Sequence, residues 1–259
     1  VLICVHGLTR VGADFDALAA SMCDQVRVIC PDVVGRGRSD FLKNPQYYMV
    51  PQYVSDMVTL LARVLHPDAS QQVDWLGTSM GGLIGMGMAS LPGNPVRRLI
   101  LNDIGPNLDP VAMARIAEYL GKNMSYDSFE QAQADIRQIS LPFGPHTDQE
   151  WRKISSDVLR QSSDGRWHRL YDPAIALPFA NMSAESVEYG QAGLWAAYDA
   201  IRCPTLLVRG ELSDLLTRAT AEQMAGRGPC AQLVELAGVG HAPTFVHADQ
   251  IDIVIQFFA

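Results

Sequence analysis

The sequence has no long apolar run and no basic segment. Of its 259 residues, 20 are lysine or arginine and 28 are aspartate or glutamate, so the formal net charge is −8. Nucleic-acid-binding domains are usually basic, so nucleic acid is not expected as a partner. No window approaches the roughly 18 consecutive apolar residues that a membrane span needs, so a membrane partner is not expected either.

Cysteine is scarce and unpatterned. The five cysteines form no CxxC pair and no cluster with histidine. Their odd number and apolar neighbours predict buried thiols in a reducing compartment, which indicates a cytoplasmic protein. No metal-ligand spacing is present, so neither a metal nor another cofactor is expected.

No secretory signal precedes the first strand. The chain begins directly with the apolar stretch VLICVHG, which reads as a core strand and not as a targeting segment. We therefore expect native residues upstream of this strand to be missing.

Short apolar segments alternate with helical patterns over most of the chain. The expected strands are residues 1–5, 26–30, 73–76, 97–102, 205–209 and 231–236. Runs that are apolar throughout are typical of strands buried on both faces of a parallel sheet. The alternation predicts an α/β fold with a doubly wound, mostly parallel sheet.

The alternation breaks after residue 102. Residues 107–199 contain no convincing buried strand, and residues 109–124, 125–139, 146–161 and 183–201 read as helices. We predict a core made of residues 1–106 and 200–259, interrupted by a helical cap at residues 107–199.

A serine lies among glycines at the end of the third expected strand, in GTSMGG. Active sites of parallel α/β sheets lie at the carboxyl ends of strands. Ser79 occupies such a position, where a sharp turn into a helix has no room for side chains at Gly77, Gly81 and Gly82. Ser79 is therefore the predicted nucleophile.

A nucleophilic serine needs a base and an acid that orients it. His241, in the glycine-flanked loop after the last expected strand, is the predicted base. Asp214, which follows the strand before it, is the preferred acid. Asp103, in LILNDIGP, also follows a strand and remains the alternative acid or a residue of the pocket.

The first expected strand leads into HGLTR. The backbone N–H groups of Leu8 and Met80 are the predicted oxyanion hole. We expect His6 to hold this loop through hydrogen bonds to backbone, and Arg36 to have a structural role. The remaining histidines lack motif context and are expected at the surface or at helix caps: His66, His146, His168 and His247.

Together these motifs resemble the α/β-hydrolase family. They are HG at residues 6–7, DVVGRGRSD at 32–40, GTSMGG at 77–82, GELSD at 210–214 and GVGHAP at 238–243. The resemblance implies a sheet of eight strands, of which the first two are expected to be absent here. It also implies a helical cap at the position of the insertion and a serine hydrolase close to the esterases and lactonases.

The predicted function is hydrolysis of carboxylic esters of small to medium apolar substrates, esters or lactones, by a monomer or homodimer. A carbon–carbon bond hydrolase of aromatic degradation and a non-catalytic receptor on the same fold are the alternatives. Aromatic residues of the cap predict an apolar lining, with Trp167 and Trp195 as the candidate substrate contacts. Arg166, Arg169 or Lys153 could meet a substrate carboxylate.

Overall fold

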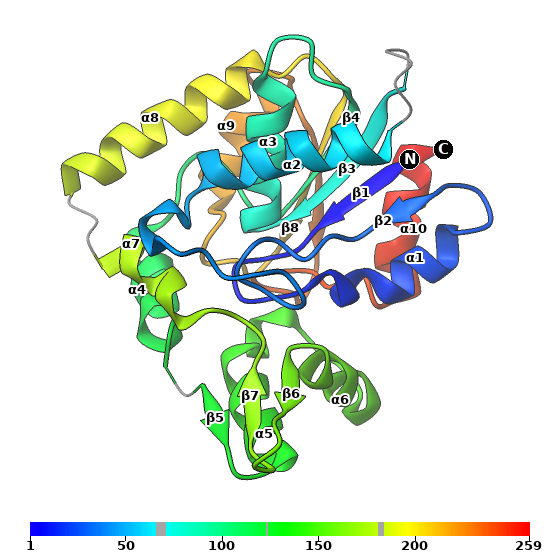
Figure 1. Cartoon of the computed structure of the whole chain (residues 1–259). Coiled ribbons are helices and arrows are strands. Elements are labelled where there is room, and N and C mark those ends of the chain that lie inside the picture. Colours follow the sequence, from blue (N-terminus) through cyan, green and yellow to red (C-terminus); the bar gives the residue numbers. More distant parts are fainter. Residues whose placement is uncertain (66–70, 123, 181–183) are drawn as a thin grey trace.

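The computed structural model describes residues 1–65, 71–122, 124–180 and 184–259 (Figure 1). Its centre is a six-stranded sheet in the order β2-β1-β3-β4-β8-β9, in which every neighbouring pair is parallel. The strands are β1 (Leu2–Val5), β2 (Val28–Ile29), β3 (Val73–Thr78), β4 (Val96–Asn102), β8 (Thr205–Gly210) and β9 (Gln232–Leu236). The predicted parallel α/β fold is confirmed.

Helices cover both faces of this sheet because successive strand residues point to opposite sides. In β1, Leu2 and Cys4 face the side covered by α1 (Asp16–Met22) and α10 (Ala248–Phe258). Ile3 and Val5 face the other side, which carries α2, α3, α8 and α9 (Figure 1). These four helices are Val50–Val64, Met80–Ser90, Ala184–Ala200 and Arg218–Ala225.

Residues 107–199 leave the sheet after β4 and return before β8. They contain α4 (Pro110–Tyr119), α5 (Phe129–Ile139), α6 (Asp148–Ser156), α7 (Leu177–Ala180) and α8. In Figure 1, α4 to α7 form a group beside one end of the central sheet, whereas α8 runs back over its helical layer. The end of α8 packs into the core, since Tyr198 is fully buried there.

This segment also contains strands that the sequence did not reveal. A small antiparallel sheet has the order β5-β7-β6, made of Ser125–Tyr126, Trp167–Arg169 and Leu159–Gln161. The expectation of helix over residues 146–161 is therefore wrong beyond Ser156, where α6 ends. Strands of two or three residues are too short to display the two-residue period by which strands are recognised.

The cysteines and two of the histidines differ in how far they match the expectations. All five cysteines are free, but Cys23 and Cys230 are exposed, so the prediction of buried thiols is wrong for these two. His247 lies at the N-cap of α10, and His66 lies outside the described residues. In the described parts of the chain, no helix is both long and apolar enough to cross a membrane.

The first turn of α3 lies directly against β1. A Cβ atom at Gly81 would lie 2.0 Å from the carbonyl oxygen of Val5, a distance that only backbone movement could relieve. We expect Gly81→Ala to lower the free energy of unfolding by more than about 3 kcal/mol, measured by urea denaturation.

The matched control is Gly193→Ala in α8, where no atom outside the adjoining backbone of the helix lies within 4 Å of the added methyl group. Alanine favours helix over glycine, so this variant should be more stable than the parent by up to about 1 kcal/mol. A Gly81→Ala protein that unfolds at the parent's urea concentration would contradict the close contact of α3 with β1.

Candidate active site

Ser79 lies at the turn between β3 and α3. Its backbone has φ 53° and ψ −118°, a strained conformation that persists only where the surroundings enforce it. The enforcing contact is close: a Cβ atom at Gly77 would lie 2.2 Å from the carbonyl oxygen of Gly81. The backbone N–H of Ser79 also donates to the carbonyl of Asn102, at 2.9 Å. This is the sharp strand-to-helix turn that the sequence predicts.

The structure brings Ser79 and His241 together with Asp103. The Nε2 atom of His241 is 2.9 Å from the Oγ of Ser79, and its Nδ1 atom is 2.7 Å from the Oδ2 of Asp103. Ser79, His241 and Asp103 come from segments that follow β3, β9 and β4. Both ring nitrogens of His241 are thus engaged, one by a hydroxyl and the other by a carboxylate.

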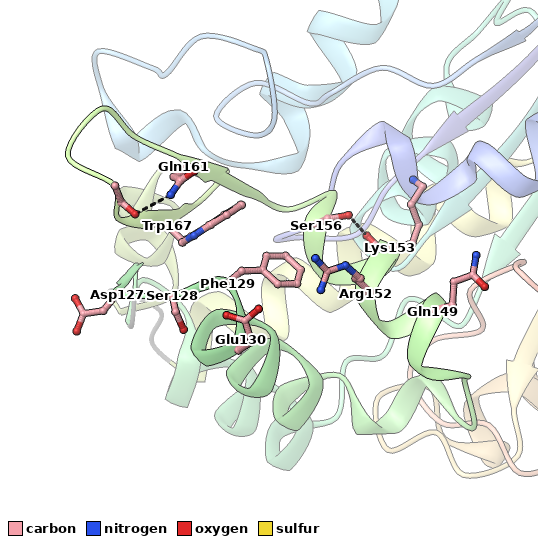
Figure 2. Close-up of a pocket in the computed structure, with 11 residues that line it drawn as sticks. Asp127, Ser128, Phe129, Glu130, Gln149, Arg152, Lys153, Ser156, Gln161 and Trp167 are labelled. Carbon is pink, nitrogen blue, oxygen red and sulfur yellow. Dashed lines mark hydrogen bonds between the residues drawn. The ribbon is translucent and has the colours of Figure 1, made fainter.

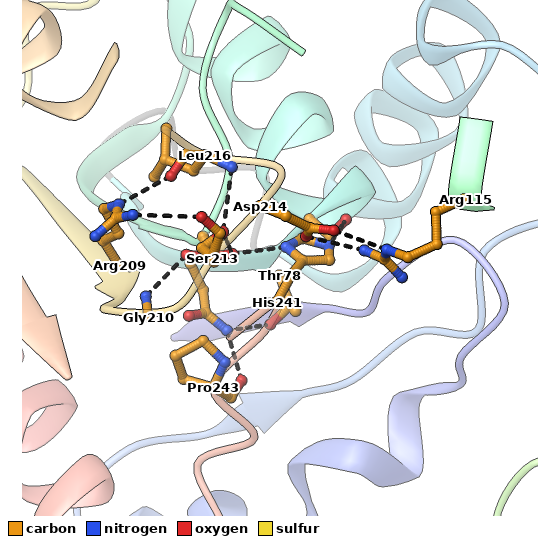
Figure 3. Close-up of polar contacts among 12 residues, drawn as sticks. Thr78, Arg115, Arg209, Gly210, Ser213, Asp214, Leu216, His241 and Pro243 are labelled. Carbon is orange, nitrogen blue, oxygen red and sulfur yellow. Dashed lines mark hydrogen bonds and ion pairs between the residues drawn. The ribbon is translucent and has the colours of Figure 1, made fainter. Parts of the chain in front are cut away.

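Asp214, the acid preferred from the sequence, does not reach His241. Its carboxylate accepts two hydrogen bonds from Arg115 of α4, from Nε at 2.7 Å and from Nη2 at 2.9 Å (Figure 3). The turn after β8 explains this placement. Ser213 points into the site and donates to Asp103, whereas the next residue, Asp214, points toward α4 and is 45% exposed.

Asp103 is fully buried and has three donors around it. Besides the contact with His241, its carboxylate accepts from the backbone N–H of Gly210 at 2.9 Å and from the hydroxyl of Ser213 at 2.6 Å. A buried carboxylate requires such partners, because an unsatisfied buried charge is costly. Ser213 was not among the residues predicted for the site, although it lies within the GELSD motif.

The predicted oxyanion residues lie on either side of the nucleophile. Leu8 follows β1, Met80 begins α3, and Leu8 lines the same cavity as Ser79. Among the described residues, neither backbone N–H has an acceptor in the protein. Both N–H groups are therefore available to a ligand. Met80 is also the first residue of α3, and the helix dipole stabilises negative charge at that end.

Arg36 contacts both of the predicted oxyanion residues, Leu8 and Met80. It is fully buried, its Nε donates to the carbonyl of Leu8 at 2.8 Å, and its Nη2 contacts the sulfur of Met80 at 3.5 Å. Its guanidinium lies over the rings of Tyr48 and Tyr53. Within the described residues it has no carboxylate partner at ion-pair distance, so the structural role expected for Arg36 extends to the Leu8 carbonyl and the Met80 side chain.

His6 connects the Leu8 loop to the loop that follows β2. Its Nδ1 lies 2.7 Å from the carbonyl of Gly7, and its Nε2 accepts from the backbone N–H of Val33 at 2.9 Å. This pattern requires a neutral ring with its proton on Nδ1. Burial lowers the pKa of His6 to about 4. The predicted bridging role of His6 agrees with these bonds.

Ser79 and His241 open into a narrow cavity of about 80 Å³. Its apolar lining comes both from residues 107–199 and from the rest of the chain. These residues are Leu8, Ile116, Tyr119, Ile136, Ile139, Phe143, Val158, Tyr171 and Ala242. A larger hollow of about 690 Å³ lies between α5, α6 and β7 (Figure 2). Among the described residues, none of Ser79, His241 and Asp103 lines that hollow.

The structure places neither candidate tryptophan at the Ser79 cavity. Trp167 lies on β7 against Phe129 and lines the larger hollow (Figure 2). Trp195 lies on α8, packed edge-on against Tyr198 and under the guanidinium of Arg227. Both assignments assumed that the aromatic residues of the segment lie on its face toward Ser79. Instead, β7 places Trp167 in the larger hollow, and the return of α8 to the core places Trp195 against Tyr198.

Of the cations considered for a substrate carboxylate, Arg166 and Lys153 lie on the surface. Arg166 pairs with Asp127, and Lys153 pairs with Asp16 and Asp157. Arg169 does line the Ser79 cavity. In the described part of the chain, no group of three histidine, cysteine or acidic side chains is arranged to hold a metal ion.

Comparison with known proteins identifies the family. Residues 2–254 match the model of the alpha/beta hydrolase family. The chain belongs to this family. It is 51% identical over its whole length to the 3-hydroxybutyrate-oligomer hydrolase of Cupriavidus necator, of which it covers 88%. These matches confirm the predicted fold and a hydrolase of the esterase type.

More distant relatives agree with this assignment. An esterase of Mycobacterium tuberculosis is 28% identical over 85% of this chain and 70% of its own length. The crystal structure of an alpha/beta hydrolase from Novosphingobium aromaticivorans superposes with a TM-score of 0.85 at 32% identity, covering 99% of this chain and 88% of that one. The family resemblance therefore includes residues 107–199 as well as the sheet.

The neutral state of His6 makes the stability of the protein depend on pH. An unfolded histidine takes up its proton near pH 6.5, whereas folded His6 does so only near pH 4. The contribution of neutral His6 to the free energy of unfolding is present in full above about pH 6.5. It is lost as the pH falls toward 4, where the folded ring takes up its proton. Between pH 7 and 4.5 the loss should be about 2.5 kcal/mol.

The measurement is the free energy of unfolding at pH 7 and at pH 4.5 for the parent and for His6→Asn. The variant should be less stable at pH 7 but should lose about 2.5 kcal/mol less on acidification. The control His168→Asn, in β7, should retain the parent's pH dependence. Equal acid losses in the parent and in His6→Asn would show that His6 is not held neutral.

Proposed function

We propose that the enzyme hydrolyses carboxylic esters of short hydroxyalkanoate units through an acyl-enzyme formed on Ser79. The observation that carries this proposal is the continuous chain of contacts from Ser79 Oγ through His241 to Asp103, at 2.9 and 2.7 Å. A hydroxyl becomes a competent nucleophile when an adjacent base takes its proton and a third group orients that base.

The proposed reaction has two steps. His241 Nε2 takes the proton of Ser79 as Oγ attacks the ester carbonyl, and Asp103 stabilises the resulting imidazolium through Nδ1. The carbon–oxygen bond breaks and His241 returns the proton to the leaving alcohol. Water, deprotonated in turn by His241, then attacks the acyl-enzyme, which releases the acid and restores Ser79.

The backbone N–H groups of Leu8 and Met80 would bind the oxyanion formed in each step. Oxyanion stabilisation is effective when the donors are fixed before the reaction. Arg36 contributes to this fixation, because it holds the carbonyl of Leu8 and contacts the side chain of Met80.

The proposed substrate class rests on the lining and on the relatives. The apolar side chains around Ser79 suit short aliphatic units, and the narrow cavity favours small ones. The relative from Cupriavidus necator is a hydrolase of 3-hydroxybutyrate oligomers, and identity of 51% over the whole chain supports a similar substrate here. Such an oligomer is a chain of ester bonds between four-carbon units.

Residues 107–199 act as the cap in this proposal. They supply ten of the eighteen residues that line the Ser79 cavity, from α4, α5, η3 (Leu141–Phe143) and the strands of the small sheet and their flanks. A cap of this kind excludes water and sets the size of the acyl group. Its specificity would arise from Ile116, Tyr119 and Phe143 and not from the tryptophans.

Replacement of the nucleophile is the first test. Ser79→Ala should lower kcat for short-chain p-nitrophenyl esters and for 3-hydroxybutyrate dimer by about 10⁴-fold or more, because no other group can form the acyl-enzyme. Circular dichroism of the variant should match that of the parent. Near-normal turnover by folded Ser79→Ala would refute the mechanism, and lack of any ester turnover by the parent would favour the carbon–carbon hydrolase or receptor alternatives.

A second test compares the two aspartates. Asp103→Asn should lower kcat by about 10⁴-fold, since an amide favours the wrong tautomer of His241 and does not stabilise its cation. Asp214→Asn should lower kcat far less, because Asp214 contacts Arg115 and not His241. A larger loss of kcat in Asp214→Asn than in Asp103→Asn, on a neutral ester, would restore Asp214 as the catalytic acid.

A further inference from the structure

Arginine is frequent around the Ser79 cavity although the protein is acidic. Three arginines line it, Arg10, Arg115 and Arg169, and no aspartate or glutamate is among its described lining residues. The chain as a whole has a formal net charge of −8. Each of the three arginines is paired with an aspartate that does not line the cavity: Arg10 with Asp14, Arg115 with Asp214 and Arg169 with Asp135. An arginine can bind an anionic substrate from such a pair only where its guanidinium keeps N–H groups that the protein does not use.

Two of these arginines are committed to the protein. Arg10 is bound to both carboxylate oxygens of Asp14 and to the carbonyl of Ile154, and its side chain is 12% exposed. Arg169 is bound to Tyr126 and to Asp135, and its side chain is 4% exposed. Both therefore have little freedom to contact a ligand.

Arg115 is different. Its side chain is 33% exposed, and it uses Nε and Nη2 to hold Asp214. Among the described residues, no protein acceptor contacts its Nη1 atom. Figure 3 shows the guanidinium of Arg115 directed at the carboxylate of Asp214. The edge formed by Nη1 and Nη2 therefore remains for a second, bidentate partner.

We propose that Arg115 binds the free carboxylate of the ester substrate, held in position by Asp214. The inference rests on the proposed function and specifies its substrate class as anionic esters. Asp214 fixes one edge of the guanidinium, so the other edge is presented in a defined orientation. Because Arg115 and Ser79 line one narrow cavity, the carboxylate and the cleaved ester belong to neighbouring units of the substrate.

This arrangement predicts which bond is cleaved in a hydroxyalkanoate oligomer. With the carboxylate at Arg115, the ester carbonyl nearest the carboxyl end lies at Ser79, and the leaving alcohol is the terminal hydroxy acid. Ser79 Oγ forms its bond to the carbonyl carbon, the carbon–oxygen bond to that terminal unit breaks, and His241 supplies the proton to the released oxygen. Each cycle removes one unit from the carboxyl end.

The test uses two forms of 3-hydroxybutyrate dimer, one with the free carboxylate and one with a terminal carboxamide. The ester bond is the same in both. The parent should prefer the acid, and Arg115→Gln should lower the ratio of kcat/KM for acid to that for amide by about 10- to 100-fold, mainly through KM. Arg115→Lys should recover part of the ratio, since it keeps the charge but not the bidentate contact.

The control is Arg218→Gln on α9, which removes a charge from an exposed arginine paired with Glu222 and should leave the ratio as in the parent. If Arg115→Gln lowers kcat/KM equally for the acid and the amide, their ratio is unchanged and the carboxylate site is overturned. Binding of the acid dimer to Ser79→Ala, measured by calorimetry with and without Arg115→Gln, gives a readout that does not depend on turnover. Equal affinities there would overturn it too.

These outcomes are separable from failure of the proposed function. If the parent hydrolyses p-nitrophenyl butyrate in a Ser79-dependent manner but shows no preference for the acid dimer, the esterase function stands and the carboxylate site is refuted. With the 3-hydroxybutyrate trimer, the first products should be monomer and dimer that retains the original hydroxyl end. Early release of the hydroxyl-end unit as monomer would contradict the proposed direction of cleavage.

Discussion

The site depends on the close packing of the first turn of α3 against the ends of β1 and β3. Because Gly77 and Gly81 leave no side chain in this contact, α3 begins directly over the sheet and Ser79 is held in a strained conformation. The neighbouring strand continues the arrangement: Asn102 accepts from the backbone of Ser79, and its side chain donates to Thr78 and to the carbonyl of Pro243, in the loop of His241. One packing constraint therefore fixes the relative positions of three loops, and the catalytic distances follow from it.

The sheet and the placement of Ser79 beside His241 could be predicted from the sequence because each depends on a local pattern. Apolar runs, the glycines around Ser79 and the glycine-flanked loop of His241 are all visible in a few consecutive residues. The carboxylate that contacts His241 was ambiguous for a physical reason, since Asp103 and Asp214 both follow parallel strands at the same edge. What decides between them is the direction of one turn, in which Ser213 faces inward and Asp214 outward. No short-range pattern specifies that direction, so the choice required the structure.

The surroundings of the site were harder to predict for a related reason. Aromatic residues of the segment 107–199 suggested an aromatic lining, but an apolar side chain can be buried against any surface that excludes water. Trp195 packs near Tyr198 on the core side of α8, and Trp167 packs on Phe129. Three other aromatic residues of the segment, Tyr119, Phe143 and Tyr171, do line the cavity, beside aliphatic side chains. Arg36 was expected to be structural, yet its contact with Leu8 could not be read from the sequence, because it links loops 28 residues apart.

The loop of Arg36 also limits how the segment can move. Backbone hydrogen bonds join Gly37 to Leu170 and Asp172 to Gly35, so the returning part of the segment is attached to the loop that holds Leu8. Lifting this part away would displace the peptide proposed to receive the oxyanion. Among the described contacts, α5 has no such hydrogen bond to that loop, whereas α4 is held to the core by the contact of Arg115 with Asp214. If the cavity opens beside α5, residues 170–172 would stay bound to the loop of Arg36 while α5 moves. The enzyme could then admit each substrate without rebuilding its oxyanion site in every cycle.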